Sequence, residues 1–316
     1  MKYIESFREG EQVRGIYLCK SRHTAATKAG KPYDNVVLQD KTGAIDSKIW
    51  DPTSGGIEEY DKMDYVDIVG DVTSFNGALQ LNIKRLRRAS EGEYDTKDYF
   101  PMSEKNIDEM YAELLKFTDS VKEPHLHKLL EIFFWDDAAF AKEFKNHSAA
   151  KSVHHSFIGG LLEHTLTVTK ICDFYTTLYP ILNRDLLITA AICHDIGKIK
   201  ELSSFPENDY TDEGQMLGHI VMGIEMVGEA VKRIDGFPKK LSTELRHCIA
   251  AHHGELEYGS PKKPAIIEAI ALNFADNADA KMETMKEAFS NVPEGNTDWL
   301  GYNRLVESNI RRTSRR

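Results

Sequence analysis

Nine of the twelve histidines lie in one stretch of the chain, between His147 and His253. Within this stretch and just beyond it, histidines and aspartates form an ordered set: His164, His194-Asp195, His219, His252-His253 and Asp276. Successive members are separated by 30, 25, 33 and 24 residues, about the length of one helix and its connection. We therefore expect each member to come from a different helix and the set to converge on one pocket, as metal sites in helical bundles do.

The His194-Asp195 pair follows an apolar run, Leu186–Ile192, so both side chains are expected to be buried. Burying an adjacent imidazole and carboxylate is costly unless they are paired or bind a metal. A single histidine on an apolar face is usually a core residue, and it is the ordered set that predicts a metal site. The set contains no thiolate, which argues against structural zinc and suits Mn, Fe or another first-row metal.

The spacing of apolar residues differs between the N-terminal part of the chain and the part that contains these histidines. Up to residue 90 it consists of short β-type runs closed by turn residues, whereas beyond residue 103 the apolar spacing is helical. Five strands are predicted, at Gln12–Lys20, Tyr33–Gln39, Ala44–Trp50, Tyr65–Thr73 and Ala78–Leu86. The Asn76-Gly77 dipeptide favours a type I′ turn between the last two strands. We expect a small five-stranded OB-type β-barrel in residues 1–90, a linker over 91–103, and an all-helical domain over 104–316 that ends in a basic tail.

An SH3-like barrel also has five strands, and the placement of basic and aromatic residues favours the OB type. The loop between the first two predicted strands contains Lys20, Arg22, Lys28 and Lys31, and the end of the fifth contains Lys84, Arg85, Arg87 and Arg88. OB barrels hold single strands between the corresponding loops, on the face of strands two and three. Candidate stacking platforms there are Tyr33, Trp50 and Phe75. The alternative is that the charges are merely solvated and the aromatic rings belong to the core.

Composition narrows the class of protein further. With 41% hydrophobic and 28% charged residues, the chain is typical of a soluble globular protein, and no apolar run reaches the roughly 18 residues that a membrane span needs. The four cysteines, Cys19, Cys172, Cys193 and Cys248, form no CxxC pair, which predicts reduced thiols and a cytoplasmic location. The net charge is −10, divided as +1 over residues 1–90 and −11 over 91–316, so any site for a polyanion must be local.

The ordered set resembles the HD superfamily of metal-dependent phosphohydrolases. More closely, an OB-type domain followed by the segments HHSFIGGLLEHT, CHDIGK and AHHGELEYGSPKKP resembles the YhaM family of 3′→5′ exoribonucleases, over nearly the whole chain. The HD motif is specific for fold and metal, and the order of the two domains is the part that is specific for substrate. The resemblance implies a Mn²⁺-dependent exonuclease, with Fe, Co or Ni as alternative metals. Its substrate would be single-stranded RNA, with single-stranded DNA as a further one, and its products nucleoside 5′-monophosphates.

The resemblance also implies roles for individual residues in a centre of two metals. The first metal would be held by His164, His194, Asp195 and Asp276. The second would be held by His219 and His252, with His253 as a further ligand and Asp195 as the bridge between the two metals. The superfamily also includes members with a third metal, and His253 could instead bind that ion or the substrate.

Four further residues have two interpretations each. Lys198 shares a helical face with His194 and could neutralise charge on the phosphoryl transition state, or it could be a solvated helix end. His154 and His155 could position phosphate or donate a proton to the leaving 3′-oxygen, or they could cap the fold. Asp279 shares a helical face with Asp276 and could replace it as a ligand.

Two other functions are compatible with the sequence. A hydrolase of small or cyclic nucleotides could use the same HD site, although it would not need a strand-binding barrel. A binding module without enzymatic activity would leave the HD site structural. The segment 104–150 has apolar faces that either pack inside the chain or against another copy, which favours a homo-oligomer: Leu129, Leu130, Ile132, Phe133, Phe134 and Trp135.

Overall fold

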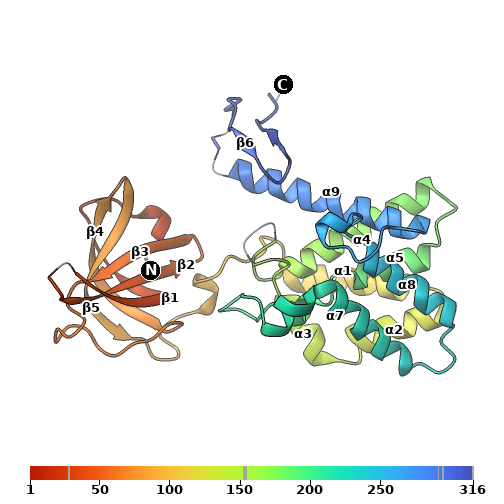
Figure 1. Ribbon diagram of the computed structural model, residues 1–316, viewed down its shortest axis with the longest axis horizontal. Helices are drawn as coiled ribbons and strands as arrows, with labels where there is room; N and C mark the ends of the chain where they lie inside the picture. The colour runs from red at the N-terminus through yellow and green to blue at the C-terminus, as the bar shows by residue number, and fades with distance from the viewer. Residues whose placement is uncertain (28, 152–154, 291, 294, 315–316) are drawn as a thin grey trace. The chain divides into compact units, whose positions relative to one another are not determined.

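The computed structural model describes residues 1–27, 29–151, 155–290, 292–293 and 295–314 (Figure 1). The chain forms two compact units, residues 1–102 and residues 103–316. Two of the predicted site residues, Lys28 and His154, lie outside the described residues. Within the described ranges, no helix has the length and apolar character needed to cross a bilayer.

The first unit is a closed five-stranded barrel with the order β1-β2-β3-β5-β4. Its strands are β1 (Gln12–Ala26), β2 (Pro32–Asp40), β3 (Gly43–Ile49), β4 (Tyr65–Phe75) and β5 (Ala78–Arg88), and a short 3₁₀ turn, η1 (Ile4–Ser6), precedes them. Neighbouring strands are antiparallel except β3 and β5, which are parallel. Strand β1 closes the barrel because its first half pairs with β4 and its second half with β2. This Greek-key arrangement of five strands is the OB fold, and it confirms the prediction.

Local sequence explains how the strands bend and turn. Strand β4 alternates between buried and half-buried residues, as expected for a strand with one face in the barrel core. The turn at Asn76-Gly77 has φ values of 50° and 82°, which confirms the predicted type I′ geometry. Gly70 lies at an irregularity in the β4–β5 pairing, where a Cβ atom would stand 2.7 Å from the carbonyl oxygen of Asn82. Any other residue would push these two strands apart.

Two predicted boundaries were wrong. Strand β1 continues to Ala26, so Lys20 and Arg22 belong to a strand rather than to the loop after it. Residues 91–102, expected to form a linker, pack on the barrel and belong to the first unit. The reason lies in their aromatic side chains, because Tyr94 stacks on Tyr65 and Tyr99 is buried beside both rings. A 3₁₀ turn, η2 (Thr96–Asp98), lies within this segment.

The second unit is helical, as predicted. Its helices are α1 (Ile107–Ser120), α2 (Pro124–Phe134), α3 (Ala138–Asn146), α4 (Gly160–Leu178), α5 (Arg184–Cys193), α6 (Lys198–Glu201), α7 (Asp212–Lys232), α8 (Lys239–Ala251) and α9 (Ile267–Ser290), with a 3₁₀ turn, η3 (Leu256–Tyr258), before α9. Side-chain N-caps begin five of them, at Asn106, Glu123, Asp137, Asn183 and Thr211.

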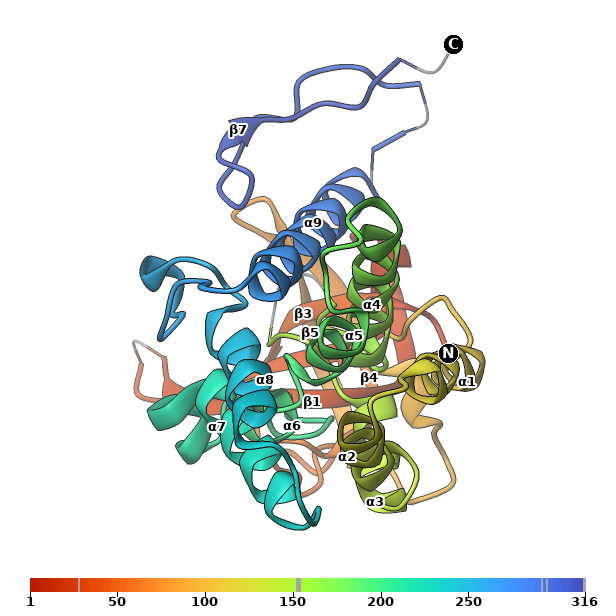
Figure 2. The same cartoon turned by 90° about the vertical axis from the view of Figure 1, so that its right-hand side faces the viewer.

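Helix α5 lies at the centre of this unit, and every residue from Leu186 to Cys193 is buried (Figure 2). Helices α4, α8 and α9 pack against it, so the loops and helix faces at one end of α5 are held by a continuous core. The apolar face of α2 joins the same core, which buries Leu129, Phe133 and Phe134 within the chain. The observation that favoured a homo-oligomer is therefore accounted for by internal packing, although Trp135 remains exposed.

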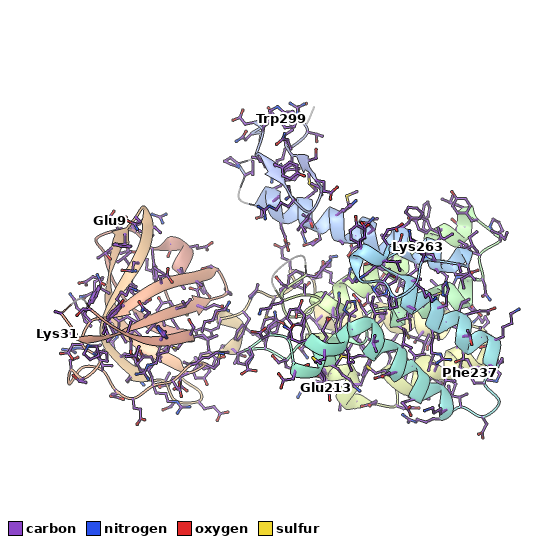
Figure 3. All side chains as sticks on the ribbon, viewed as in Figure 1. Glu9, Lys31, Glu213, Phe237, Lys263 and Trp299 are labelled. Atoms are coloured by element: carbon purple, nitrogen blue, oxygen red, sulfur yellow. The ribbon has the colours of Figure 1, made fainter. Side chains whose placement is uncertain are left out.

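A small hairpin of β6 (Tyr302–Asn303) and β7 (Ser308–Asn309) follows α9. Residues after it were expected to form a free basic tail, but two of its arginines have structural contacts. Arg311 lies over the ring of Trp299, a residue labelled in Figure 3. Arg312 lies over Phe289 and donates to the carbonyl oxygen of that residue. The end of the tail, Arg315 and Arg316, lies outside the described residues.

Candidate metal centre and strand-binding surface

The ordered His/Asp set converges on one place in the helical unit, and its members come from separate helices as predicted. His164 is in α4, His219 in α7 and Asp276 in α9. His194 and His252 are the C-cap residues of α5 and α8, so Asp195 and His253 directly follow them. Because the core fixes all five helices against one another, these side chains converge without help from a mobile loop.

The first group of atoms surrounds the Nε2 atom of His164. This nitrogen lies 3.2 Å from Nε2 of His194, 3.2 Å from Oδ1 of Asp276 and 3.4 Å from Oδ2 of Asp195. Ligand atoms about 2.1 Å from a common ion, at tetrahedral or octahedral angles, lie about 3.0–3.4 Å apart. The three distances from His164 are therefore those expected between ligands of one ion.

The second group surrounds the other carboxylate oxygen of Asp195. Its Oδ1 atom lies 3.5 Å from Nε2 of His219 and 3.6 Å from Nε2 of His252. All three atoms are buried, and none has a hydrogen-bond partner among the described residues. Buried polar atoms are rarely left without a partner, so three that face one another fit a bound cation. Since each oxygen of Asp195 faces a different group, this carboxylate is placed to bridge two ions.

The other ring nitrogen of each histidine is occupied by the protein. Nδ1 of His164 bonds to Asp279 at 2.7 Å, and Nδ1 of His219 bonds to Glu201 at 3.0 Å. The same atoms of His194 and His252 donate to backbone carbonyl oxygens, each at 2.7 Å. These partners hold the proton on Nδ1 and leave the Nε2 lone pair free, which is how ligand histidines are oriented in metal sites.

The charge of the centre also suits cation binding. Burial acts to raise the pKa of Asp195, but the ammonium of Lys198, 2.6 Å away, and the neighbouring imidazoles hold that pKa well below its usual range. Burial lowers the pKa of His252 well below its usual value. The carboxylate is therefore ionised and the imidazole neutral at pH 7, the forms in which each side chain can ligate a metal.

Where the side chains lie bears on three of the predicted alternatives. Asp279 contacts Nδ1 of His164, whereas Asp276 contacts Nε2, which favours Asp276 as the ligand and Asp279 as the residue that orients the ring. His155 is buried and bonds to Asp279 at 3.0 Å. This bond favours a structural role for His155 over a contact with substrate phosphate, and the choice between the two stays a prediction. His253 lies beside His219 and His252, close enough to share an ion with them.

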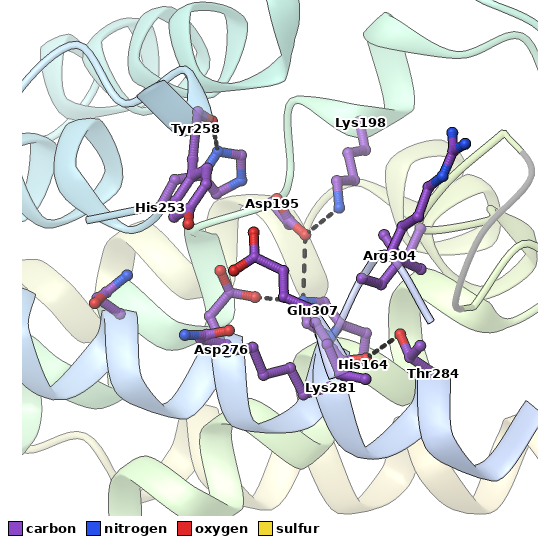
Figure 4. A pocket seen from close by; sticks show the side chains of 16 residues that line it. His164, Asp195, Lys198, His253, Tyr258, Asp276, Lys281, Thr284, Arg304 and Glu307 are labelled. Atoms are coloured by element: carbon purple, nitrogen blue, oxygen red, sulfur yellow. Dashed lines mark hydrogen bonds and ion pairs between the residues drawn. The ribbon is translucent and has the colours of Figure 1, made fainter. Parts of the chain in front are cut away.

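A pocket of about 460 Å³ opens over this centre, entirely within the helical unit (Figure 4). Among its lining residues are the predicted His164, Asp195, Lys198, His253 and Asp276. Sequence reasoning missed Tyr258, Asn273, Lys281, Arg304 and Glu307, which line the same pocket. Tyr258 stands within the quoted segment AHHGELEYGSPKKP, so the motif itself held a signal for it. Glu201, the partner of His219, was also missed, and only its place three residues after the CHDIGK segment, at the end of α6, pointed to it.

On the barrel, the predicted aromatic residues lie at or near the surface. Tyr33 and Trp50 stack with ring centroids 5.2 Å apart, and the indole of Trp50 donates to Asn82. Trp50 is 54% exposed and Phe75, at the β4–β5 turn, is 63% exposed. Exposed rings held in a fixed orientation are the usual stacking platforms of OB folds.

The predicted basic residues divide into two classes. Arg22 bonds to the buried Asp34 and covers the ring of Tyr60, and Arg87 pairs with Asp67 and Glu93. Lys84 pairs with Asp71, and Arg88 pairs with Asp64. These four cations are paired with carboxylates of the barrel itself, which favours a structural role for them, and for Arg22 in particular. The remaining described members are exposed and have no ion pair among the described residues: Lys20, Lys31 and Arg85.

Comparison with known proteins agrees with this description. The family model of the HD domain matches residues 161–281, which contain every residue of the two ligand groups, so the helical unit carries an HD domain. A curated relative, the 3′-5′ exoribonuclease YhaM of Geobacillus sp. (strain WCH70), is 33% identical over 295 residues, or 93% of this chain and 90% of its own length. The chain belongs to the YhaM family of 3′-5′ exoribonucleases.

Two solved structures are similar to the barrel. One is the second OB-fold domain of replication protein A from Methanococcus maripaludis, with 16% identity, a TM-score of 0.24, and coverage of 29% of this chain and 96% of that domain. The other is a replication protein A heterotrimer bound to ssDNA, with 18% identity, a TM-score of 0.22, and coverage of 28% of this chain and 64% of that one.

Proposed function

We propose that this protein is a metal-dependent 3′→5′ exoribonuclease that hydrolyses single-stranded RNA to nucleoside 5′-monophosphates, with single-stranded DNA as a second substrate. The observation that carries the proposal is the pair of ligand groups on either side of Asp195, of which three buried atoms face one another without a hydrogen-bond partner among the described residues. Membership of the YhaM family supports the choice of RNA and the direction of digestion.

His164, His194, Asp195 and Asp276 would hold one divalent ion, and His219 and His252 would hold a second, with His253 beside them. Two divalent ions supply Lewis-acid charge that activates water and offsets the charge of the phosphate. The nitrogen and oxygen ligands, without a thiolate, support Mn²⁺ over structural zinc.

The remaining pocket residues orient the substrate. Lys198 is half-buried beside Asp195 and points into the pocket, where its ammonium can bind a phosphate oxygen as negative charge develops. On the barrel, the Tyr33–Trp50 stack is suited to unpaired bases and would reject the closed stack of a duplex. The expected location is the cytoplasm, where the four buried, unpaired cysteines would stay reduced.

The test is product analysis on a 5′-labelled single-stranded RNA with added Mn²⁺. The wild type should give a descending ladder of labelled fragments together with free nucleoside 5′-monophosphates. Asp195→Ala should abolish both, because it removes a ligand from each group at once. Asp108→Ala is the matched control, since this exposed aspartate lies on α1 and its one ion pair within the described part of the chain is with Lys145.

Other outcomes would contradict the proposal in defined ways. An intact RNA, with hydrolysis only of cyclic dinucleotides or mononucleotides, would replace the nuclease with a small-nucleotide hydrolase. Full activity in Asp195→Ala would remove the HD site from the reaction. A matched DNA strand, run in parallel, measures the preference between the two sugars.

A further inference from the structure

The C-terminal hairpin is built as a defined element. Strands β6 and β7 pair at Tyr302–Asn309 and Asn303–Ser308, and backbone bonds between Leu300, Gly301 and Ile310 extend the pairing. The side chain of Asn303 closes the tip by accepting from the backbone of Leu305 and Val306. At the base, Ile310 is buried and Arg312 bonds to the end of α9. The tip therefore has a fixed conformation and an anchored base.

The tip lies at the metal centre. Its four residues, Arg304 to Glu307, line the same pocket as His164, Asp195 and Lys198, although they are about thirty residues beyond the last ligand in the sequence. In the close view, Arg304 and Glu307 stand over the ligand residues, opposite α9 (Figure 4). The hairpin thus forms one wall of the cleft that a substrate must enter.

Arg304 differs from the other arginines of this segment. Arg311 and Arg312 cover aromatic rings, but the guanidinium of Arg304 has no ion pair or hydrogen bond among the described residues. It is exposed and lines the same pocket as Lys198, which already has a carboxylate partner. A guanidinium offers donors in a planar fork that matches phosphate oxygens, and a free one beside a phosphodiester site has an obvious ligand.

We propose that Arg304 binds a phosphate of the RNA strand, the one next to the scissile phosphate on its 5′ side, and that the hairpin tip is a substrate-binding wall of the active site. Lys198 touches Asp195 and so serves the scissile phosphate, whereas Arg304 extends from the opposite wall toward the pocket mouth. This inference rests on the proposed function, because it assigns a subsite to that same reaction.

The second charge on the tip makes the inference specific. Glu307 carries a carboxylate into the same pocket, so Arg304 and Glu307 together give the tip no net charge. The tip cannot attract RNA simply as a basic patch. Any contribution of Arg304 to RNA binding must therefore come from the position of its guanidinium in the pocket.

The first experiment compares charge-matched variants on a trinucleotide RNA with Mn²⁺. Arg304→Gln should raise KM about tenfold, the usual effect of losing one charged hydrogen-bonding contact. Arg233→Gln, at the exposed end of α7, removes the same charge away from the pocket and should change KM by less than about twofold. The double variant Arg304→Gln with Glu307→Gln restores the net charge of the tip and should remain as impaired as Arg304→Gln.

The second experiment identifies the phosphate. The trinucleotide is made with a neutral methylphosphonate at its 5′ linkage, leaving the scissile linkage intact. The wild type should lose about tenfold in kcat/KM on this strand, and Arg304→Gln should lose little, because its partner is already absent.

The outcomes separate the two levels of inference. If the wild type does not hydrolyse RNA at all, the proposed function is wrong. If it does, but Arg304→Gln behaves like Arg233→Gln, only the subsite is wrong. If the double variant recovers the wild-type KM, Arg304 acts only through the net charge of the tip, and the proposed contact with a phosphate is wrong. An equal loss on the methylphosphonate strand in wild type and Arg304→Gln would rule out the assigned phosphate.

Discussion

Replacing Asp279 by asparagine should weaken one of the two metal sites and leave the other unchanged. A single oxygen of Asp279 accepts from Nδ1 of His164 at 2.7 Å and from Nε2 of His155 at 3.0 Å. Asparagine has the same shape and can still accept a hydrogen bond, but it lacks the charge. The imidazole of His164 then becomes a weaker base on its ligating side.

The size of the effect follows from these contacts. A hydrogen bond between an imidazole and a carboxylate contributes about 1.5–3 kcal/mol, and removal of such a partner typically costs ten- to a hundredfold in metal affinity. We expect a loss within this range for the ion held by His164. Among the described residues, Asp279 has no hydrogen bond or ion pair with His219 or His252, so the affinity for an ion held by those two should stay within about twofold of the wild-type value.

The assay is a titration of metal-free protein with Mn²⁺ in competition with a fluorescent chelator, which resolves two sites of different affinity. Asp108→Asn provides the same chemical change on an exposed residue and should leave both affinities unchanged. Circular dichroism shows whether Asp279→Asn retains its helices, and Asp279→Glu tests whether charge alone, at the wrong length, restores binding. The reasoning is refuted if Asp279→Asn retains both affinities, or if it loses both equally while still folded.

Three further predictions concern other parts of the molecule. Glu201→Gln should lower the affinity for the ion beside His219 by about tenfold, measured in the same chelator titration, because the side chain that orients this ring loses its charge. Trp50→Ala should weaken binding of single-stranded RNA by about 1–3 kcal/mol, measured by fluorescence anisotropy, and by the same amount for different base sequences. Gly197→Ala should lower the melting temperature by several degrees, since its Cβ would stand 2.0 Å from the carbonyl oxygen of His219. Gly223→Ala, which meets nothing closer than 3.5 Å in the middle of α7, should leave it unchanged or raise it.

The metal centre was predictable from sequence because its geometry is dictated by the helices. Histidines and aspartates spaced by one helix and a connection must converge if each helix packs on α5, and His164, His194 and Asp276 do so. The choice between Asp276 and Asp279 as the metal ligand was harder to make from sequence. Both share a face of α9, and only the side of His164 that each one meets separates a ligand from its supporting residue.

The charged residues of the barrel show a different limit. Arg22 and Arg87 are basic like Lys20 and Lys31, and nothing in their sequence surroundings marks them as paired. Their partners, Asp34 and Asp67, are brought beside them by strand register, which arises only when β1 meets β2 and β4 meets β5. The C-terminal hairpin was missed for a similar reason. Its two strands are two residues each, too short to leave an alternating pattern.

The candidate ligands join helices that lie far apart in the sequence, from α4 to α9, while all four cysteines are unpaired. Bound ions would therefore act as removable cross-links, tying together segments that no covalent bond connects. The free energy that such a link adds to folding grows with the logarithm of the free ion concentration. A shortage of the metal would lower the protein's resistance to unfolding and proteolysis together with its activity, so that metal supply would set the lifetime of the molecule as well as its turnover.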